Sequence, residues 1–295
     1  MPVTAAIDPL TVSVSVVAPS PSNPLANLVR SAGATKHRLA HRLSPAGRRR
    51  NQRDAFENWR DFRSALQGVD DGETVLVARS GVRIAVRHNR YDAMIVGEQF
   101  ITKDYIRHFT APTGRTPVVV DVGGYIGDFT LWCADALDAH VIVYEPAGEN
   151  WEMLTRNIAL NPGLAERIDA VPRGVASTGE VRANVVVHGN EVHVSSQWYA
   201  DDPSAEKRTF VCDTLPQIVE RAGGHIDLLK VDCEGAEYDI FDGATPEVYA
   251  ACDHIVFERH RIPGWKDRLA AIESAMQMAG LATSHHGDLI CAHRR

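Results

Sequence analysis

The sequence predicts an α/β fold, in which a doubly wound, mostly parallel sheet carries helices on both faces and ends in an antiparallel hairpin. From residue 118 onward, short apolar runs of strand length alternate with segments of helical periodicity, which is typical of a parallel sheet. The apolar runs are continuous rather than alternating, as expected of strands that are buried on both faces. Near the end of the chain, two short runs are joined by a turn dipeptide, which indicates the hairpin.

Each element is predicted from its own pattern. The predicted strands are 118–122, 140–146, 168–172, 226–233 and 254–259. The predicted helices between them are "GDFTLWCADAL", "ENWEMLTRNIAL" and a segment around "TLPQIVERAG". A last helix, 264–279, precedes the two runs that Gly287-Asp288 joins.

Three segments differ in composition and define the predicted organisation. Residues 1–50 are rich in Pro, Ser, Ala and Arg without a sustained period, and they are predicted to be a disordered basic arm. Residues 51–115 are predicted to be a lead-in, consisting of a helix over 52–66, a hairpin turning at Ser80-Gly81 and a second helix over 93–109. We expect this lead-in to pack on or cap the domain of residues 116–295.

The charge of the chain is unevenly distributed. Residues 1–53 contain eight Lys and Arg and one acid, a net charge of +7, so the remainder carries −14 within the total of −7. A net acidic body is unfavourable for binding nucleic acid, because phosphates require a basic surface. We therefore expect no nucleic-acid partner, and the charge leaves the oligomeric state open.

The cysteines and the apolar segments bear on the compartment. The five cysteines show neither CxxC spacing nor zinc-finger spacing, which favours buried free thiols in a reducing compartment. There is no run of about 18 apolar residues, and the apolar N-terminal stretch has no basic region before it. These features predict a cytoplasmic protein with no membrane partner.

The stretch "VVVDVGGYIGDFT" places an aspartate and three glycines between a strand and a helix. Asp121 ends the strand, and Gly123, Gly124 and Gly127 form the turn. In a doubly wound sheet, ligands bind beyond the carboxyl ends of the strands, and glycines let a ligand approach the backbone. A carboxylate at this place disfavours a pyrophosphate and favours a cation.

A second acid, Glu145, ends the next predicted strand. An ionised carboxylate can accept hydrogen bonds from the two hydroxyls of a ribose. A ligand with a cationic centre and a ribose fits S-adenosylmethionine better than NAD. Asp121 and Glu145 are therefore predicted to bind opposite ends of S-adenosylmethionine.

The stretch "IDLLKVDCEGAEYDIF" places a lysine and three acids on and after the fourth predicted strand. We expect Lys230 to pair with an acid on a neighbouring strand, and Glu237 to be a structural residue at a helix start. Asp232 ends the strand beside the first one, and it is predicted to be functional. It is a candidate both for cofactor binding and for catalysis.

These stretches, together with "VYEP" and "NIALN", resemble the FkbM family of S-adenosylmethionine-dependent methyltransferases over about residues 118–258. The resemblance implies the class I fold, with a seven-stranded sheet whose last strand is antiparallel. It also implies O-methylation of a hydroxyl on a small molecule such as a sugar or polyketide-type metabolite. Where the family often has Gly-Ala-Asn, this chain has Gly123-Gly124-Tyr125. Tyr125 either replaces the polar contact of the asparagine with its hydroxyl or leans over the methionine end of the cofactor.

Methyl transfer to a hydroxyl requires removal of a proton, for which the sequence offers two mechanisms. His260, in "FERHR", is the favoured base, with activity rising through a pH of about 6.5, and Asp232 and Glu234 complete the predicted catalytic set. Alternatively, Asp232, Glu234 and Glu258 could hold a divalent metal ion, which is not favoured. Two other functions remain open: a methyltransferase acting on protein or RNA, and a non-catalytic module with this fold that binds partners.

Overall fold

Seven strands form the central sheet of the computed structural model, in the order β12-β13-β11-β10-β3-β4-β5. The structure describes residues 51–294 except 69–71, 89–90, 189–190 and 196–203, so the predicted arm of residues 1–50 lies outside the described residues. The seven strands are β3 (Val118–Val122), β4 (His140–Tyr144), β5 (Ile168–Val171), β10 (Ile226–Val231), β11 (Cys252–Glu258), β12 (Leu281–His286) and β13 (Leu289–Arg294). The sheet thus contains all five strands predicted between residues 118 and 259.

The directions of the strands confirm the predicted doubly wound fold. Strand β3 pairs in parallel with both β4 and β10, and β10 pairs in parallel with β11. The strand order reverses between β3 and β10, so the carboxyl ends of these two strands flank the switch point where such folds bind ligands. Only β13 runs against the rest, because it pairs antiparallel with β11 and with β12. The predicted hairpin is therefore present, with its second strand inserted next to β11.

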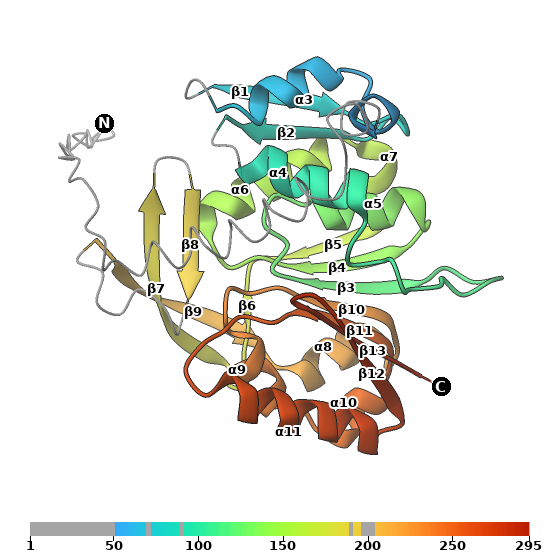
Figure 1. The fold of residues 1–295 in the computed structure, drawn as a ribbon, viewed down its shortest axis with the longest axis vertical. Helices are drawn as coiled ribbons and strands as arrows, with labels where there is room; N and C mark the ends of the chain where they lie inside the picture. The colour runs from blue at the N-terminus through green and yellow to red at the C-terminus, as the bar shows by residue number, and fades with distance from the viewer. Residues whose placement is uncertain (1–50, 69–71, 89–90, 189–190, 196–203, 295) are drawn as a thin grey trace, which may run out of the picture. The chain divides into compact units, whose positions relative to one another are not determined.

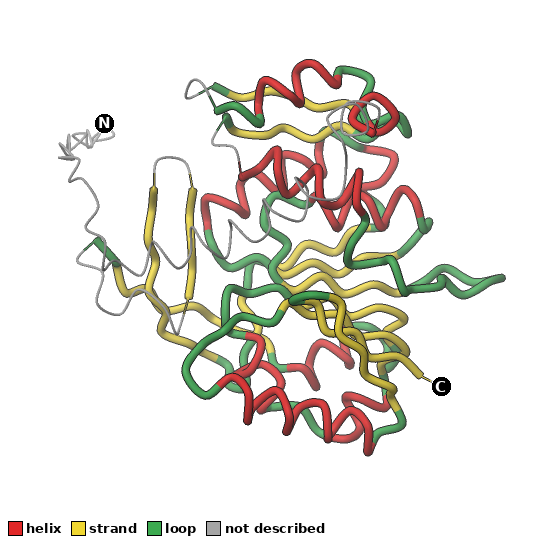
Figure 2. Tube along the Cα trace, in the orientation of Figure 1, coloured by secondary structure: helices red, strands yellow, loops and turns green. Residues whose placement is uncertain are grey.

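Helices cover both faces of the sheet, and Figure 2 shows the strands between the two groups. The helices α4 to α7 lie on one face and α8 to α11 on the other (Figure 1). Their bounds are α4 (Tyr91–Gly97), α5 (Asp128–Ala136), α6 (Gly148–Ala159), α7 (Pro162–Ala165), α8 (Leu215–Arg221), α9 (Glu237–Asp242), α10 (Pro246–Ala250) and α11 (Trp265–Met278). None of the helices in the described part of the chain is both long and apolar enough to cross a bilayer.

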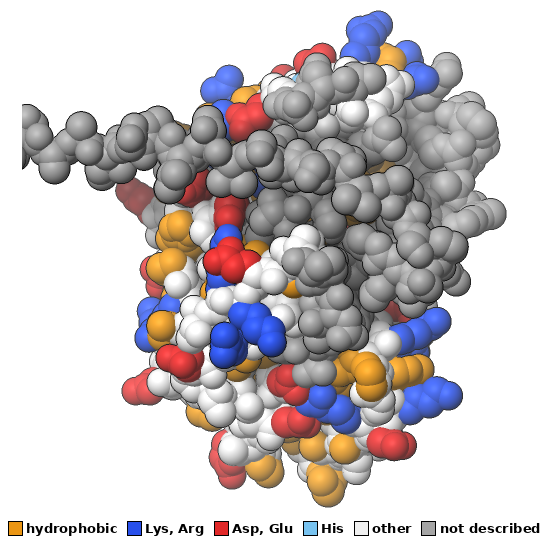
Figure 3. All heavy atoms as spheres, turned by 90° about the vertical axis from the view of Figure 1, so that its left-hand side faces the viewer, with side chains coloured by type: hydrophobic (Ala, Val, Ile, Leu, Met, Phe, Trp, Pro, Cys, Tyr) orange, Lys and Arg blue, Asp and Glu red, His pale blue; other side chains and the backbone are white. Residues whose placement is uncertain are grey.

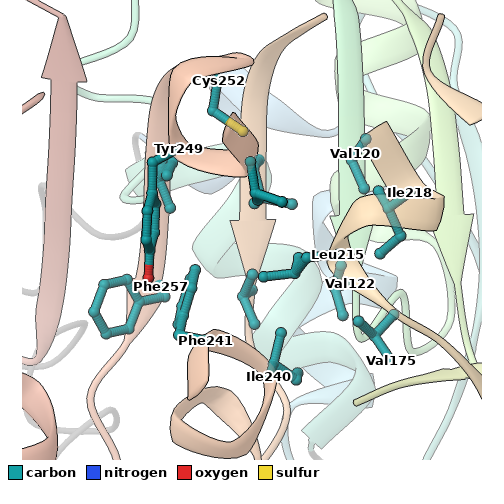
Figure 4. Packing of buried hydrophobic residues seen from close by; sticks show 14 of the residues in the cluster. Val120, Val122, Val175, Leu215, Ile218, Ile240, Phe241, Tyr249, Cys252 and Phe257 are labelled. Atoms are coloured by element: carbon teal, nitrogen blue, oxygen red, sulfur yellow. The ribbon is translucent and has the colours of Figure 1, made fainter. Parts of the chain in front are cut away.

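Alternate residues of the strands pack against the two helical layers. In β3, Val119 belongs to the cluster that contains Phe129 and Trp132 of α5. Its neighbour Val120 belongs to the larger cluster on the opposite face, which includes Ile218 of α8. Figure 4 shows this larger cluster, where the ring of Phe241 lies 5.0 Å from that of Phe257. Burial on both faces explains why the strands read as continuous apolar runs.

The lead-in contains the predicted hairpin, formed by β1 (Glu73–Val77) and β2 (Arg83–Arg87), which pair antiparallel. The prediction of one helix over 52–66 is wrong, because the helix is interrupted before α3 (Trp59–Ala65). At the interruption, Phe56 bridges to Ala78, and the side chain of Asn58 binds the backbone of β1 at Val75 and Val77. The backbone at the interruption thus bonds to the hairpin instead of continuing the helix.

The second predicted helix of the lead-in, over 93–109, ends earlier than expected. Helix α4 continues into the π-helix η1 (Glu98–Thr102), and Lys103 then takes the left-handed conformation with φ of 55°. A left-handed residue ends a helix. Residues 103–109 are therefore not helical and pass over the sheet as a separate segment.

A second sheet, which the sequence analysis did not predict, has the order β6-β9-β7-β8. Its strands are β6 (Gly174–Val175), β7 (Glu180–His188), β8 (Glu191–Ser195) and β9 (Glu206–Asp213). They lie in the chain between β5 and α8, to one side of the central sheet in Figure 1. The hydroxyl of Ser195, at the end of β8, donates to the carbonyl of Glu234 at 3.0 Å, so this sheet reaches the turn that follows β10.

Two asparagines attach the hairpin of the lead-in to the rest of the chain. The fully buried side chain of Asn157 accepts from the N–H of Ala85 at 2.8 Å and donates to the carbonyls of Ala85 and Ile126. Asn161 makes the same kind of pair with the backbone of Arg83. The described part of the chain also falls within one compact unit.

Replacement of Asn157 should destabilise the protein, because it leaves a buried N–H and two carbonyls without partners. We expect Asn157→Ala to lower the free energy of unfolding by about 3 kcal/mol, measured by urea denaturation. Gln277→Ala is the control, since the side chain of Gln277 makes an exposed bond to Thr283, and it should change stability by no more than about 0.5 kcal/mol. Equal stability of the two variants would show that the asparagine does not hold the hairpin.

Candidate active site

The glycine turn lies between β3 and α5, and its close contacts are with the protein itself. The N–H groups of Gly123 and Gly124 both donate to the carbonyl of Tyr144, at 3.0 and 2.9 Å. A Cβ on Gly123 would lie 2.0 Å from the carbonyl oxygen of Asp232, and one on Gly124 would lie 2.1 Å from Val143 Cγ2. Gly127, with φ of 89°, leads into α5. The sequence pattern predicts that these glycines let a ligand approach, but at Gly123 and Gly124 the neighbouring strands already require them.

Asp121 does not face a ligand as predicted, because it is fully buried and its charge is paired within the protein. Its Oδ1 lies 3.0 Å from Lys230 Nζ, as an ion pair without hydrogen-bond geometry. Its Oδ2 accepts from the hydroxyl of Thr130 at 2.7 Å. The cation that the carboxylate requires is therefore Lys230, and the predicted pairing of this lysine with an acid on a neighbouring strand is confirmed.

Glu145 follows β4 and is also buried, and its two oxygens bond to the glycine turn and to the start of α6. Oε2 accepts from the N–H of Tyr125 at 2.9 Å, and Oε1 accepts from the N–H of Ala147 at 2.8 Å. Burial raises the pKa of Glu145 to about 7, while these two N–H groups act in the opposite direction. A carboxylate oxygen has two lone pairs, so each oxygen retains one for a further hydrogen bond.

Tyr125 directs its hydroxyl towards the lead-in. The hydroxyl donates to Asp92 Oδ1 at 2.6 Å, and Arg87 Nη2 donates to the same hydroxyl at 3.2 Å. Arg87 and Asp92 form a buried ion pair with 2.8 Å between Nε and Oδ2. The hydroxyl of Tyr125 thus joins the hairpin and α4 to the glycine turn.

Two carboxylates meet beyond the ends of β10 and β11. The hydroxyl of Tyr105 donates to Asp232 Oδ2 at 2.6 Å and lies 3.3 Å from Glu258 Oε2. Asp232 is half-buried and stands directly behind Gly123, so it adjoins the glycine turn. The structure therefore brings Asp232, the glycine turn and Glu258 together at the switch point.

His260 is close to these groups, but it is already engaged. Its Nδ1 lies 3.0 Å from Glu237 Oε1, and its side chain is only 9 % exposed. Burial lowers the pKa of His260, but the carboxylates of Glu237, Glu234 and Glu258 outweigh it and raise that pKa well above 6.5. The titration expected near 6.5 is therefore moved to higher pH, which disfavours His260 as the base at neutral pH.

Glu237 and Glu234 differ in their surroundings, although both follow β10. Glu237 is fully buried, and its Oε1 also accepts from the N–H of Cys233 at 2.7 Å, which supports the structural role expected for it. Glu234 has a left-handed backbone with φ of 51°, and its side chain is 43 % exposed. Its Oε2 lies 3.8 Å from His260 Nε2, so this predicted catalytic residue lies at the rim of the site.

A metal ion could be held by a different set of residues from the one predicted. Asp232, Glu237 and His260 offer ligand atoms within 4.8 Å of one another. The predicted set of Asp232, Glu234 and Glu258 does not form such a group among the described residues. His260 Nδ1 and Glu237 Oε1 already pair with each other at 3.0 Å, and we assign no metal to this place.

Three residues that shape the site could not be predicted from the sequence: Tyr105, Arg87 and Asp92. All three belong to the lead-in, before the first strand of the central sheet, and none lies in a recognisable motif. The apolar spacing of the lead-in indicates that it contains helices, but it does not indicate which of its side chains contact the site.

The sequence of the chain is similar to those of known methyltransferases. Residues 121–288, more than half of the chain, match the family described as the methyltransferase FkbM domain. The chain is 24% identical over 220 residues to Methyltransferase sdnD of Sordaria araneosa, covering 64% of this chain and 85% of that protein. It is 25% identical over 185 residues to Methyltransferase 1 of Beauveria bassiana strain ARSEF 2860, covering 55% of this chain and 70% of that protein.

The solved structures that resemble this chain are less similar to it in sequence than these two proteins. The SAM-dependent methyltransferase from Agrobacterium tumefaciens has a TM-score of 0.44 at 12% identity, over 77% of this chain and 71% of that one. The human methyltransferase 10 domain containing protein has a TM-score of 0.43 at 11% identity, over 74% and 90%. Scores this low add nothing to what the chain itself indicates about function.

The His260–Glu237 pair should stabilise the protein in a pH-dependent way. Because the pKa of His260 is higher in the folded than in the unfolded chain, its contribution is complete below pH 6.5 and is lost as pH rises through the folded value. We expect His260→Gln to lower the free energy of unfolding by about 3 kcal/mol at pH 6, and by less at pH 9. Urea denaturation across this range measures both values.

The control for this prediction is His285→Gln, because His285 forms an exposed pair with Glu273 at 2.6 Å. An exposed pair contributes no more than about 1 kcal/mol. A loss for His260→Gln that does not change between pH 6 and 9 would contradict a protonated, ion-paired histidine.

Proposed function

We propose that this chain, which belongs to the methyltransferase FkbM domain family, transfers the methyl group of S-adenosylmethionine to a hydroxyl group of a small molecule. One observation carries the proposal. The carboxylates of Asp232 and Glu258 both bond to the hydroxyl of Tyr105, next to the glycine turn. Ionised carboxylates only accept hydrogen bonds, so this place favours an acceptor group that brings a proton of its own.

Glu145 supports S-adenosylmethionine as the cofactor, as does the family assignment. Its carboxylate lies at the end of β4, next to the switch point, and each oxygen keeps a lone pair after binding one backbone N–H. These acceptors fit the two hydroxyls of a ribose. When bound, S-adenosylmethionine supplies an electrophilic methyl group, and the protein's part is to orient the acceptor and remove its proton.

Asp232 is better suited than His260 to take that proton. His260 is protonated at neutral pH and directed at Glu237. Asp232 has one oxygen held by Tyr105, and no other hydrogen bond to its carboxylate is recorded among the described residues. Its second oxygen, Oδ1, is therefore positioned to accept from an acceptor hydroxyl, as a general base must.

The charge of the chain supports a small-molecule acceptor over a nucleic acid. The residues after 53 carry a net charge of −14. Figure 3 shows acidic and basic side chains interspersed over the described part of one face. A nucleic-acid substrate would instead require a continuous basic surface.

The cofactor site is tested by replacing Glu145. We expect Glu145→Gln to weaken the binding of S-adenosylhomocysteine by about 1.5–3 kcal/mol in calorimetry, because charged hydrogen bonds to the ribose are lost. Glu152→Gln, on the exposed side of α6, should bind as the wild type does. Unchanged affinity of the Glu145 variant at an unchanged melting temperature would remove Glu145 from the ribose site.

The reaction is tested by mass spectrometry on mixtures of hydroxylated metabolites, incubated with the enzyme and S-adenosylmethionine. We expect products heavier by one CH₂ unit that form only with active enzyme, and no such products from mixtures whose hydroxyls are blocked by acetylation. Methylation that persists after blocking, or that occurs only on protein or RNA, would refute the proposed acceptor class.

A further inference from the structure

The segment of residues 103–109, here called the cover segment, lies outside the region that matches the family, which begins at residue 121. It leaves η1 at the left-handed Lys103 and contacts the sheet at several points. The ring of His108 stacks on that of His286 of β12 at 3.8 Å, and the ring of Phe109 meets His254 of β11 edge-on at 5.8 Å. These contacts fix the cover segment over strands of the central sheet.

Tyr105 is the residue of the cover segment that reaches the candidate active site. Its ring lies 5.5 Å from Lys230 Nζ and packs at 5.9 Å, edge-on, against Phe129. A cation over an aromatic face is attracted by the ring, so the buried Asp121–Lys230 pair helps to hold the ring. The hydroxyl thereby comes to lie between Asp232 and Glu258.

We propose that Tyr105 is a positioning residue for methyl transfer, which holds the carboxylate of Asp232 so that Oδ1 faces the acceptor hydroxyl. The inference rests on the proposed function. A phenol has one proton to donate, and the 2.6 Å distance assigns it to Asp232 Oδ2. With that oxygen fixed, the carboxylate cannot rotate freely, and only its other oxygen remains to accept the acceptor's proton.

The surroundings of Tyr105 suit this role. Burial, followed by the charges of Asp232 and Glu258, raises the pKa of Tyr105 well above 10. The phenol therefore keeps its proton and donates it throughout the neutral range. It also separates two carboxylates whose mutual repulsion would otherwise disfavour the arrangement.

A double-mutant cycle tests the inference, with the wild type, Tyr105→Phe, Asp232→Ala and the double variant. Tyr105→Phe keeps the ring over Lys230 and removes only the hydroxyl. On an acceptor found by mass spectrometry, it should lower kcat about 10²-fold, with KM for S-adenosylmethionine unchanged. In the Asp232→Ala background the same change should have no further effect, because Tyr105 acts through Asp232. Full activity of Tyr105→Phe, or reductions that multiply, would overturn the inference.

The same cycle is measured on the melting temperature without any acceptor, where the two changes should again be less than additive. Additive shifts would show that the contact is absent, and would overturn the inference even if the wild type methylated nothing. If the wild type methylates no hydroxyl but the shifts in melting temperature are less than additive, only the proposed function is refuted.

Tyr249→Phe is the matched control, because it removes a hydroxyl from another buried tyrosine, which lies in α10 before β11 begins. It should leave kcat unchanged.

Discussion

The buried ion pair between Asp121 and Lys230 is the interaction on which the rest of the site depends. It joins the two central strands, β3 and β10, at the point where the strand order reverses. A charge in this position would be strongly unfavourable without its partner. Lys230 also donates to the carbonyl of Gly123 at 2.8 Å and lies under the ring of Tyr105. One cation thus links the two strands, the glycine turn and the cover segment.

This arrangement separates the residues that build the site from those that can meet a ligand. Asp121, Gly123 and Gly124 contact the protein, and they let β3, β4 and β10 end close together. Glu145 and Asp232 follow the ends of β4 and β10, and their carboxylate oxygens can each accept further hydrogen bonds. Residues of the same motif can therefore have different roles, which the partners of their side chains distinguish.

The fold could be predicted because burial on both faces leaves a local pattern. The continuous apolar runs identified β3, β4, β5, β10 and β11, and Gly287-Asp288 identified the final hairpin. The second sheet was missed, although β7 contains the apolar run 185–187. In β9 only the last two residues are buried, so this strand has no continuous apolar run. The interruption of the first helix also escaped prediction, because Asn58 bonds to residues that lie 17 and 19 positions further along the chain.

Prediction of the site was limited for the same reason. Strand ends located Asp121, Glu145 and Asp232, because the carboxyl ends of parallel strands lie at one edge. Their partners come from elsewhere in the chain, and these partners decide the chemistry. The carboxylate of Glu237 helps to raise the pKa of His260 and so disfavours it as a base. The hydroxyl of Tyr105 bonds to Asp232, which lies 127 positions further along the chain.

The insertion of β13 between β11 and β12 has a consequence for the order of folding. Among the described strands, β12 has no partner other than β13, although β12 precedes β13 in the chain. While the protein is being synthesised, β11 therefore keeps an open edge and β12 has no place in the sheet until β13 has emerged. An unpaired strand edge can pair with another chain. The edge of β11 is therefore covered only once β13 is available to pair with it.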